Sequence, residues 1–310
     1  MVTRLMMDNT EDGSFTTLLN EPLSSAIAGT TKLFSTLNIF LSITASLGNV
    51  LILIALHKVT TIHPPTKLFF RCLAVTDLGV GILVQPLYAA IIMSPWFKMN
   101  VHDAFYVVLV ALTLSWCLCG VSILTSAAVS VDRLLALFLG LRYRHVVTLR
   151  RVHGIIICFW TIGALSGWTR MQSINLAYKG TVVILTLCLV TVIFCYTMIH
   201  LKLRRQQAQL RVHNNVPQGP IAIGGGIPLN IARYKKTVCS ILWVQLALVA
   251  CYVPLYIVIV VSGKRTSHVA LRATETLVYL NSSLNPILYC WKIREVKQAV
   301  RDILRQFYCF

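Results

Sequence analysis

Residues 33–57 read LFSTLNIFLSITASLGNVLILIALH and contain no acidic residue, lysine or arginine. A bilayer core about 30 Å thick takes roughly 20 apolar residues of helix to cross, so this stretch predicts a membrane-spanning helix. Similar segments follow near 68–93, 104–131, 153–168, 180–201, 237–262 and 268–290. We therefore predict an all-α membrane protein, a seven-transmembrane helix bundle. Because the number of spans is odd, the two ends of the chain are expected on opposite sides of the membrane.

The composition agrees with these segments. Hydrophobic residues make up 56% of the chain and charged residues 12%, and the mean hydropathy is +0.73; a soluble domain carries about 25% charged residues. Seven spans use nearly all of the 310 residues, which leaves no room for a second globular domain. We expect an extracellular N-terminal segment over 1–32, a seven-transmembrane domain over 33–290, and a cytoplasmic amphipathic helix and tail over 291–310.

The basic residues lie in alternate loops. The net charge is +18, but nucleic-acid-binding domains gather their basic residues on one face, so we expect no nucleic-acid partner. The loops after the first, third and fifth segments, and the tail, hold most of the lysines and arginines. Basic loops stay cytoplasmic. This asymmetry predicts a multi-pass protein of the plasma membrane with an extracellular N-terminus, whose first span acts as its own insertion signal.

The tail after the last span has a pattern of its own. Apolar residues recur at helical spacing and basic residues fill the other face: Ile293, Val296, Val300, Ile303, Leu304 and Phe307 against Lys292, Arg294, Lys297, Arg301 and Arg305. A basic amphipathic helix lies in the headgroup plane, so membrane lipids are expected partners. Cys309 follows this helix and is a palmitoylation candidate. The alternative is an unmodified cysteine at a frayed helix end.

Polar residues occur where a bilayer disfavours them. Asp77 lies near the middle of the second segment, where an aspartate costs roughly 2.5–3.5 kcal/mol to insert. We interpret it as functional; the alternative is a neutral, hydrogen-bonded acid. Asn49, Asn281 and Asn285 also lie deep in segments. If these side chains converge, they form a polar island that could hold a cation.

Glu275 is a second acid inside a span, about one turn from the outer end of the last segment. Tyr279 follows four residues later and shares its helix face. Two readings stay open: a ligand contact in an outward-facing pocket, or a carboxylate that reaches to the outer interface.

Prolines inside three segments predict kinks whose freed carbonyl groups need partners from neighbouring helices or water: Pro86, Pro254 and Pro286.

Together these residues resemble the rhodopsin-type (class A) G-protein-coupled receptors over all seven segments. The matching residues, in chain order, are Gly48-Asn49-Val50, Leu73-Ala74-Val75-Thr76-Asp77, Ser122 with Asp132-Arg133-Leu134, Trp160, Tyr196, Cys251-Tyr252-Val253-Pro254 and Asn285-Pro286-Ile287-Leu288-Tyr289. Each match is weak alone, but the whole series in order is specific. The resemblance implies a ligand-activated receptor that activates heterotrimeric G proteins through a conformational equilibrium and is not an enzyme.

The resemblance also implies roles for individual residues. The family's sodium pocket matches Asp77, Ser122, Asn281 and Asn285, so an allosteric sodium ion is the one possible cofactor. The cytoplasmic switch matches Asp132, Arg133, Tyr196, Pro254, Asn285, Pro286 and Tyr289. There the arginine meets the tip of the Gα C-terminal helix once the sixth span swings out. The ligand pocket, by position, takes Ser115, Trp116, Cys119, Tyr252, Tyr256, Glu275 and Tyr279.

Several positions depart from the family pattern. The usual cysteine near the outer end of the third span is Val108, the loop 169–179 has no cysteine, and the usual proline of the fifth span is Cys188. Melanocortin, lysophospholipid and cannabinoid receptors share these absences, so the chain is nearest to the melanocortin, lysophospholipid, cannabinoid and adenosine branch. Tyr252 replaces the usual tryptophan, and Tyr234 stands where some members place a glutamate, which implies basal activity.

The ligand class is less readable. Amine receptors use an aspartate where this chain has Ser115, so an ordinary monoamine would need Glu275 as its counter-charge. Retinal opsins need a lysine where this chain has Tyr279.

The alternatives to a receptor are an intramembrane metal-dependent hydrolase and a polytopic transporter. An intramembrane metal-dependent hydrolase needs histidines within the bilayer, but all eight lie in loops or at span ends. A polytopic transporter is expected to show inverted repeats or broken helices in matching halves, which are not seen.

Overall fold

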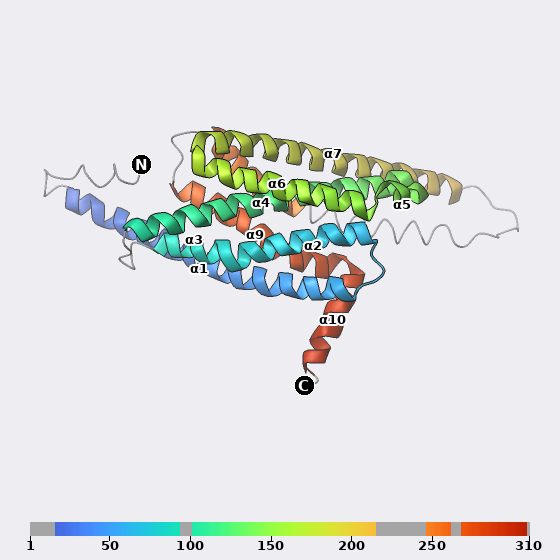
Figure 1. Cartoon of the computed structure of the whole chain (residues 1–310), viewed down its shortest axis with the longest axis horizontal. Coiled ribbons are helices and arrows are strands. Elements are labelled where there is room, and N and C mark those ends of the chain that lie inside the picture. The colour runs from blue at the N-terminus through green and yellow to red at the C-terminus, as the bar shows by residue number, and fades with distance from the viewer. Residues whose placement is uncertain (1–15, 94–100, 215–245, 262–267, 309–310) are drawn as a thin grey trace, which may run out of the picture.

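The computed structural model describes residues 16–93, 101–214, 246–261 and 268–308, which form a bundle of long helices (Figure 1). In chain order the elements are α1 (Thr16–Lys58), α2 (Pro64–Gly79), the π-helical segment η2 (Val80–Val84), α3 (Gln85–Met93), α4 (Val101–Leu139), η3 (Gly140–Arg142), α5 (Tyr143–Val146), α6 (Leu149–Gln172), α7 (Ile174–Asn214), a helix over Leu246–Val261, α9 (His268–Lys292) and α10 (Arg294–Tyr308). We call the end of the bundle where α1 begins the N-terminal end, and the opposite end, where α10 projects, the C-terminal end.

Five stretches within these helices are long and apolar enough to cross a membrane: Gly29–Lys58, Pro64–Met93, Phe105–Val146, Leu149–Gln172 and Asn175–Gln206. The sixth expected span is described as the shorter apolar helix Leu246–Val261. The seventh is α9, whose polar residues lower its hydropathy. No strand occurs among the described residues, so the all-α prediction is confirmed.

The helices extend beyond the boundaries that hydropathy predicts. α1 begins at Thr16, not near 33, and α7 continues to Asn214. With 43 residues, α1 is about 65 Å long at 1.5 Å per residue, roughly twice the thickness of a bilayer core. An α-helix satisfies its own backbone hydrogen bonds, so it does not have to end where the apolar composition ends. Tyr234 and Cys309 lie outside the described residues.

The middle of the second span is a π-helix, η2, in which hydrogen bonds run from residue i+5 to residue i. The N–H of Gln85 accordingly meets the carbonyl of Val80. Pro86 follows and has no N–H to donate to the next carbonyl, that of Gly81. The Ser42 hydroxyl of α1 donates to that oxygen at 2.6 Å. A neighbouring helix thus satisfies the carbonyl that the proline frees.

Pro286 creates the same problem in α9. The helix runs through this proline, whose missing N–H leaves the carbonyl of Ser282, four residues earlier, without its donor. Asn49 of α1 donates its Nδ2 to that oxygen at 3.0 Å, and also to the Ala45 carbonyl at 2.8 Å. Side chains of α1 therefore donate hydrogen bonds to the carbonyl groups that prolines leave free in both neighbouring spans.

α4 lies in the middle of the bundle and contacts α2, α6 and α7. Gly163 and Gly167 of α6, four residues apart, let the α6 backbone approach α4 closely. A Cβ on Gly163 would lie 2.5 Å from Val121 Cγ2 and 2.9 Å from the Cys117 carbonyl oxygen. Small residues at this spacing are a common way for membrane helices to pack.

α10 leaves the bundle at a steep angle to α1 and α9 (Figure 1). Its apolar residues Val296, Val300 and Ile303, with Ile293 just before the helix, are buried in the cluster that also holds Ile52, Leu56 and Tyr289. Leu304 departs from the predicted stripe, since 44% of its surface is exposed. Lys58 donates from Nζ to Gln306 Oε1 at 2.9 Å. The predicted amphipathic helix is present and packs against the C-terminal end of α1.

Candidate functional site

A buried polar cluster surrounds Asp77 in the middle of the bundle. The Asp77 carboxylate is 0% exposed and receives three hydrogen bonds from two helices. Asn285 Nδ2 donates to Oδ2 at 2.7 Å, and the hydroxyls of Ser282 and Ser122 donate to Oδ1 at 2.8 Å and 3.3 Å. Donors from α4 and α9 thus converge on one acid of α2, as buried charge requires.

Two amide side chains beside this cluster remain partly unsatisfied. Asn281 is 1% exposed, and neither its Oδ1 nor its Nδ2 has a hydrogen-bond partner. Asn49 uses its Nδ2, but its Oδ1 is buried without a partner. Buried polar atoms of this kind usually contact water or an ion. Asn281 was predicted beside Asp77 and shares the cluster's helix, but it forms no hydrogen bond with the acid.

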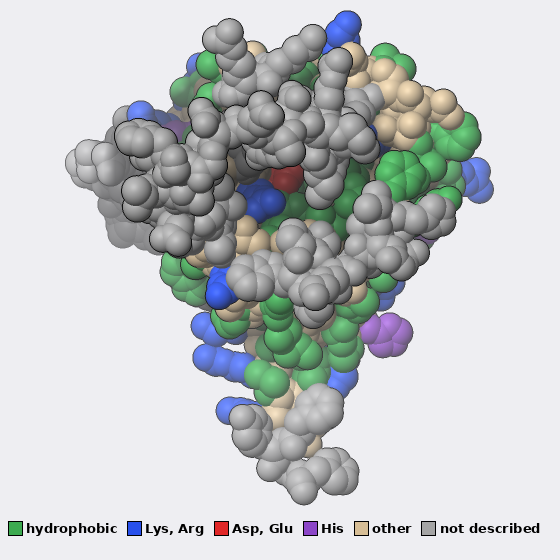
Figure 2. Space-filling view, turned by 90° about the vertical axis from the view of Figure 1, so that its left-hand side faces the viewer, with side chains coloured by type: hydrophobic (Ala, Val, Ile, Leu, Met, Phe, Trp, Pro, Cys, Tyr) green, Lys and Arg blue, Asp and Glu red, His purple; other side chains and the backbone are tan. Residues whose placement is uncertain are grey.

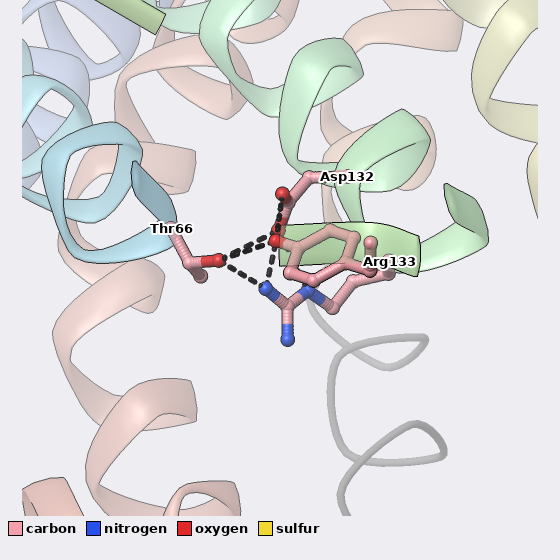
Figure 3. Close-up of polar contacts among 4 residues, drawn as sticks. Thr66, Asp132 and Arg133 are labelled. Atoms are coloured by element: carbon pink, nitrogen blue, oxygen red, sulfur yellow. Dashed lines mark hydrogen bonds and ion pairs between the residues drawn. The ribbon is translucent and has the colours of Figure 1, made fainter. Parts of the chain in front are cut away.

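A second polar cluster lies near the C-terminal end of the bundle and is centred on Asp132, in the last turns of α4 (Figure 3). Arg133 pairs with the Asp132 carboxylate, with Nε 3.0 Å from Oδ2. Thr66 of α2 donates to the same oxygen at 2.9 Å and accepts from Arg133 Nη2 at 2.6 Å. The Tyr143 hydroxyl of α5 donates to Oδ1 at 2.5 Å and lies 3.0 Å from Thr66 Oγ1.

These contacts hold the guanidinium group of Arg133 against its own helix. The side chain is 17% exposed while Asp132 is 2% exposed. Because both carboxylate oxygens are hydrogen-bonded, residues of α2 and α5 hold the ion pair in place.

The other tyrosines predicted for the cytoplasmic switch lie outside this cluster. Tyr196 is 43% exposed, with its ring 6.2 Å from His200, and Tyr289 packs edge-on against Phe70 with a ring separation of 5.2 Å.

His63 borders this cluster just before α2 begins. Its ring packs against that of Tyr143 at 5.2 Å, and its Nδ1 is buried without a hydrogen-bond partner. Burial lowers the pKa of His63 below its ordinary value of 6.5, Asp132 opposes this shift, and two nearby arginines add to it. The neutral ring is therefore favoured in the folded protein.

A pocket opens toward the N-terminal end of the bundle. Figure 2 looks at this end and shows a hollow with an acidic and a basic side chain among hydrophobic ones. The cavity measures ≈ 120 Å³ and is bounded by α4, α6, α7, α9 and the Leu246–Val261 helix. The predicted ligand residues that line it are Ser115, Trp116, Cys119, Tyr252, Glu275 and Tyr279. Tyr256 does not line it; its hydroxyl accepts a 3.3 Å hydrogen bond from Thr186 instead.

Hydrogen bonds fix the polar groups on the α9 side of this pocket. The Tyr88 hydroxyl of α3 donates to Glu275 Oε2 at 2.6 Å. The Tyr88 ring packs edge-on against Tyr279 at 5.3 Å, and the Tyr279 hydroxyl lies 3.0 Å from Ser115 Oγ. Glu275 therefore lines the pocket with its carboxylate held by α3.

Sequence reasoning did not single out several residues of these clusters. They are Ser282, Tyr88, Thr66, Tyr143 and Arg170. Ser282 had a detectable signal, since it lies three residues before Asn285 and so shares its helix face. Thr66 and Tyr88 are brought in by tertiary packing, because 66 and 187 positions separate them from Asp132 and Glu275.

The helical bundle, its central acid and its pocket define a multi-pass membrane receptor. Comparison with protein families agrees. The model of the "7 transmembrane receptor (rhodopsin family)" matches residues 48–179 and 168–289, which is most of the chain. The chain belongs to this family and is a G-protein-coupled receptor. The family has a seven-helix bundle, so the predicted fold class is confirmed.

Relatives in this family carry names from several ligand classes. The chain is 28% identical to the histamine H2 receptor of Canis lupus familiaris, over 83% of this chain and 75% of that one. It is 27% identical to the adenosine receptor A3 of Ovis aries, over 91% and 92%, and 26% identical to the melanocortin receptor 4 of Danio rerio, over 88% and 83%. The adenosine and melanocortin branches predicted from the motifs are thus among its relatives, and similar overall identity to each leaves the ligand class open.

Proposed function

We propose that this receptor lies in the plasma membrane, binds an extracellular ligand in the N-terminal-end pocket, and activates heterotrimeric G proteins at the C-terminal end. The observation that carries the proposal is the locked Asp132–Arg133 pair at the opposite end of α4 from the pocket. The single helix α4 links the pocket to the Asp132–Arg133 pair. A ligand in the pocket that shifts α4 against its neighbours therefore also moves this pair.

The charge distribution supports this orientation. Most lysines and arginines outside the spans lie in loops and a tail that share one side, and such loops stay cytoplasmic. α10 belongs to that side, where its basic face meets anionic headgroups. The N-terminus is then extracellular and the pocket opens outward. Palmitoylation of Cys309 would add a second anchor beside α10.

The Asp132 cluster gives the resting receptor a barrier to activation. To meet the C-terminal helix of Gα, Arg133 must leave the carboxylate and Thr66. Hydrogen bonds to charged groups contribute about 1.5–3 kcal/mol each, so several of them hold the arginine firmly. A ligand that moves the equilibrium from 1:99 to 99:1 must bind the active state about 5.5 kcal/mol more tightly.

A sodium ion fits the residues around Asp77. Hard cations take oxygen ligands, and the cluster offers the Asp77 carboxylate and Ser122 Oγ. The unpartnered Oδ1 atoms of Asn281 and Asn49 are further buried acceptors. A bound sodium ion would supply counter-charge to the buried acid and so favour the arrangement in which Asp77, Ser122 and α9 lie together.

Replacing Arg133 tests the proposal. Arg133→Ala should abolish activation of every Gα chimera in transfected cells while the receptor still reaches the surface. Arg150→Ala, which removes an exposed arginine outside the Asp132 cluster, is the matched control. Retained signalling by Arg133→Ala at normal surface level would refute the assigned role.

A further inference from the structure

The pocket is lined by one basic and one acidic residue, Arg170 of α6 and Glu275 of α9. Among the described residues, no ion pair joins them. They stand on separate helices around the same small cavity. Two opposite charges that line one cavity without forming an ion pair make it complementary to a ligand that carries both signs.

The guanidinium group of Arg170 lies near the Trp116 ring, but its Nε atom has no hydrogen-bond partner. Its guanidinium carbon lies 6.0 Å from the centre of the Trp116 ring, and the Trp116 ring packs edge-on against Tyr178 at 5.4 Å. The Nε atom is buried and has no hydrogen-bond partner. Buried donors of this kind are rare in folded proteins. A planar guanidinium with a free N–H favours a carboxylate as its partner.

Glu275 presents the complementary group. Tyr88 occupies Oε2, and a carboxylate has about four acceptor positions in all, so capacity remains for a second donor. The Tyr88–Tyr279 ring pair and the Ser115–Tyr279 hydrogen bond fix this side of the cavity. The acid is thus oriented in advance, which lowers the cost of binding a cationic group.

We propose that the ligand is a small amino-acid-like zwitterion with a flat aromatic group. Its carboxylate binds Arg170, its ammonium group binds Glu275, and its ring lies among the aromatic side chains of the lining. A simple amine or a simple acid would leave one buried protein charge unpaired when water is displaced, which is costly.

This inference rests on the proposed function only in using the same pocket. The test measures thermal unfolding of the purified receptor in detergent with millimolar tryptophan, tryptamine or indole-3-propionate. The last two each lack one of the charges of tryptophan. Tryptophan should raise the melting temperature and bind at least about tenfold more tightly than either analogue, since each lost charged hydrogen bond is worth that much or more. Tyrosine with tyramine forms a second matched pair.

Two variants separate the two charges. Arg170→Gln should remove the advantage of tryptophan over tryptamine, and Glu275→Gln should remove its advantage over indole-3-propionate. Lys179→Gln is the control, because Lys179 is exposed and lies outside the pocket lining. Equal binding of tryptamine, or no stabilisation by either amino acid, overturns the proposal. Basal nucleotide exchange on G proteins is measured separately, so a failed ligand class remains distinguishable from a failed receptor function.

Discussion

Gly48 of α1 lies directly against the ring of Pro286 in α9. A Cβ built on Gly48 would be 2.9 Å from both Cβ and Cγ of that proline. This glycine lets the two helices approach closely enough for Asn49, the next residue, to reach the carbonyl of Ser282 at 3.0 Å. The close packing of α1 on α9 and the hydrogen bond to the carbonyl that the proline leaves without a donor thus depend on one another.

Gly48→Ala should therefore destabilise the receptor. Its methyl group would meet buried proline atoms that cannot move aside, and overpacking of this kind costs about 1–3 kcal/mol. Thermal unfolding of the purified variant in detergent measures the loss. Gly154→Ala in α6 is the control, because nothing lies within 4 Å of its added Cβ and alanine is the better helix former. A Gly48→Ala receptor as stable as the control would contradict the packing.

Loss of the Thr66 hydroxyl should raise basal signalling. Thr66 donates to Asp132 and accepts from Arg133, so Thr66→Val weakens the lock from both sides and frees the arginine more often. Basal G-protein activation, divided by surface receptor level, should increase about tenfold or more, since a hydrogen bond to a charged group is worth about 1.5–3 kcal/mol. Thr161→Val, whose hydroxyl bonds only its own helix at Ile157, should change nothing. Lower or unchanged activity in Thr66→Val would argue that the cluster does not restrain Arg133.

Sodium should stabilise the receptor through Asp77. Replacing potassium chloride by sodium chloride at constant ionic strength should raise the melting temperature of the wild type and lower its basal activity. Asp77→Asn should remove both effects, because the neutral amide lacks the charge that attracts the ion. Glu275→Gln, which alters a different acid within the helix bundle, should retain them. A sodium effect that survives in Asp77→Asn would place the cation elsewhere.

Acid should destabilise the receptor through His63. Burial lowers the pKa of His63 below 6.5, so the unfolded chain binds more protons than the folded one as pH falls through that value. The stabilising contribution of the neutral ring is complete above pH 6.5 and declines below it. Melting temperatures recorded between neutral and mildly acidic pH should fall less in His63→Gln than in the wild type. Parallel pH curves for both proteins would exclude this role of His63.

The sequence predicts the central site well because the bilayer makes polar residues conspicuous. Asp77 and Asn285 are noticeable in apolar segments, and the structure brings them to 2.7 Å. The prediction was less complete for contacts that depend on how helices rotate. Asn281 forms no hydrogen bond with Asp77, whereas its neighbour Ser282 does. The rotation of α9 about its axis determines which of the two side chains faces Asp77, and the hydropathy of the sequence does not reveal that rotation.

Contacts between distant parts of the chain were beyond sequence reasoning. Tyr88 lies 187 positions from Glu275. Tyr143 bonds Asp132 across a turn after α4 in which Gly140 adopts a φ of 52°. A positive φ is easily reached by glycine alone, so that turn was detectable, but not the contact it produces. The close α4–α6 packing does have a sequence signal, the four-residue spacing of Gly163 and Gly167 in α6.

Nucleotide exchange by the purified receptor tests the central claim most directly. Wild-type receptor, Thr66→Val and Arg133→Ala are reconstituted in lipid nanodiscs with a panel of purified Gα subunits and βγ, and GTP-analogue uptake is followed without ligand. The account predicts that Thr66→Val, in which Arg133 is released from the Asp132 cluster, accelerates uptake by at least one Gα class more than the wild type, and that Arg133→Ala, equally folded by thermal unfolding, does not accelerate it. No acceleration by Thr66→Val with any Gα, or equal acceleration by Arg133→Ala, would contradict it.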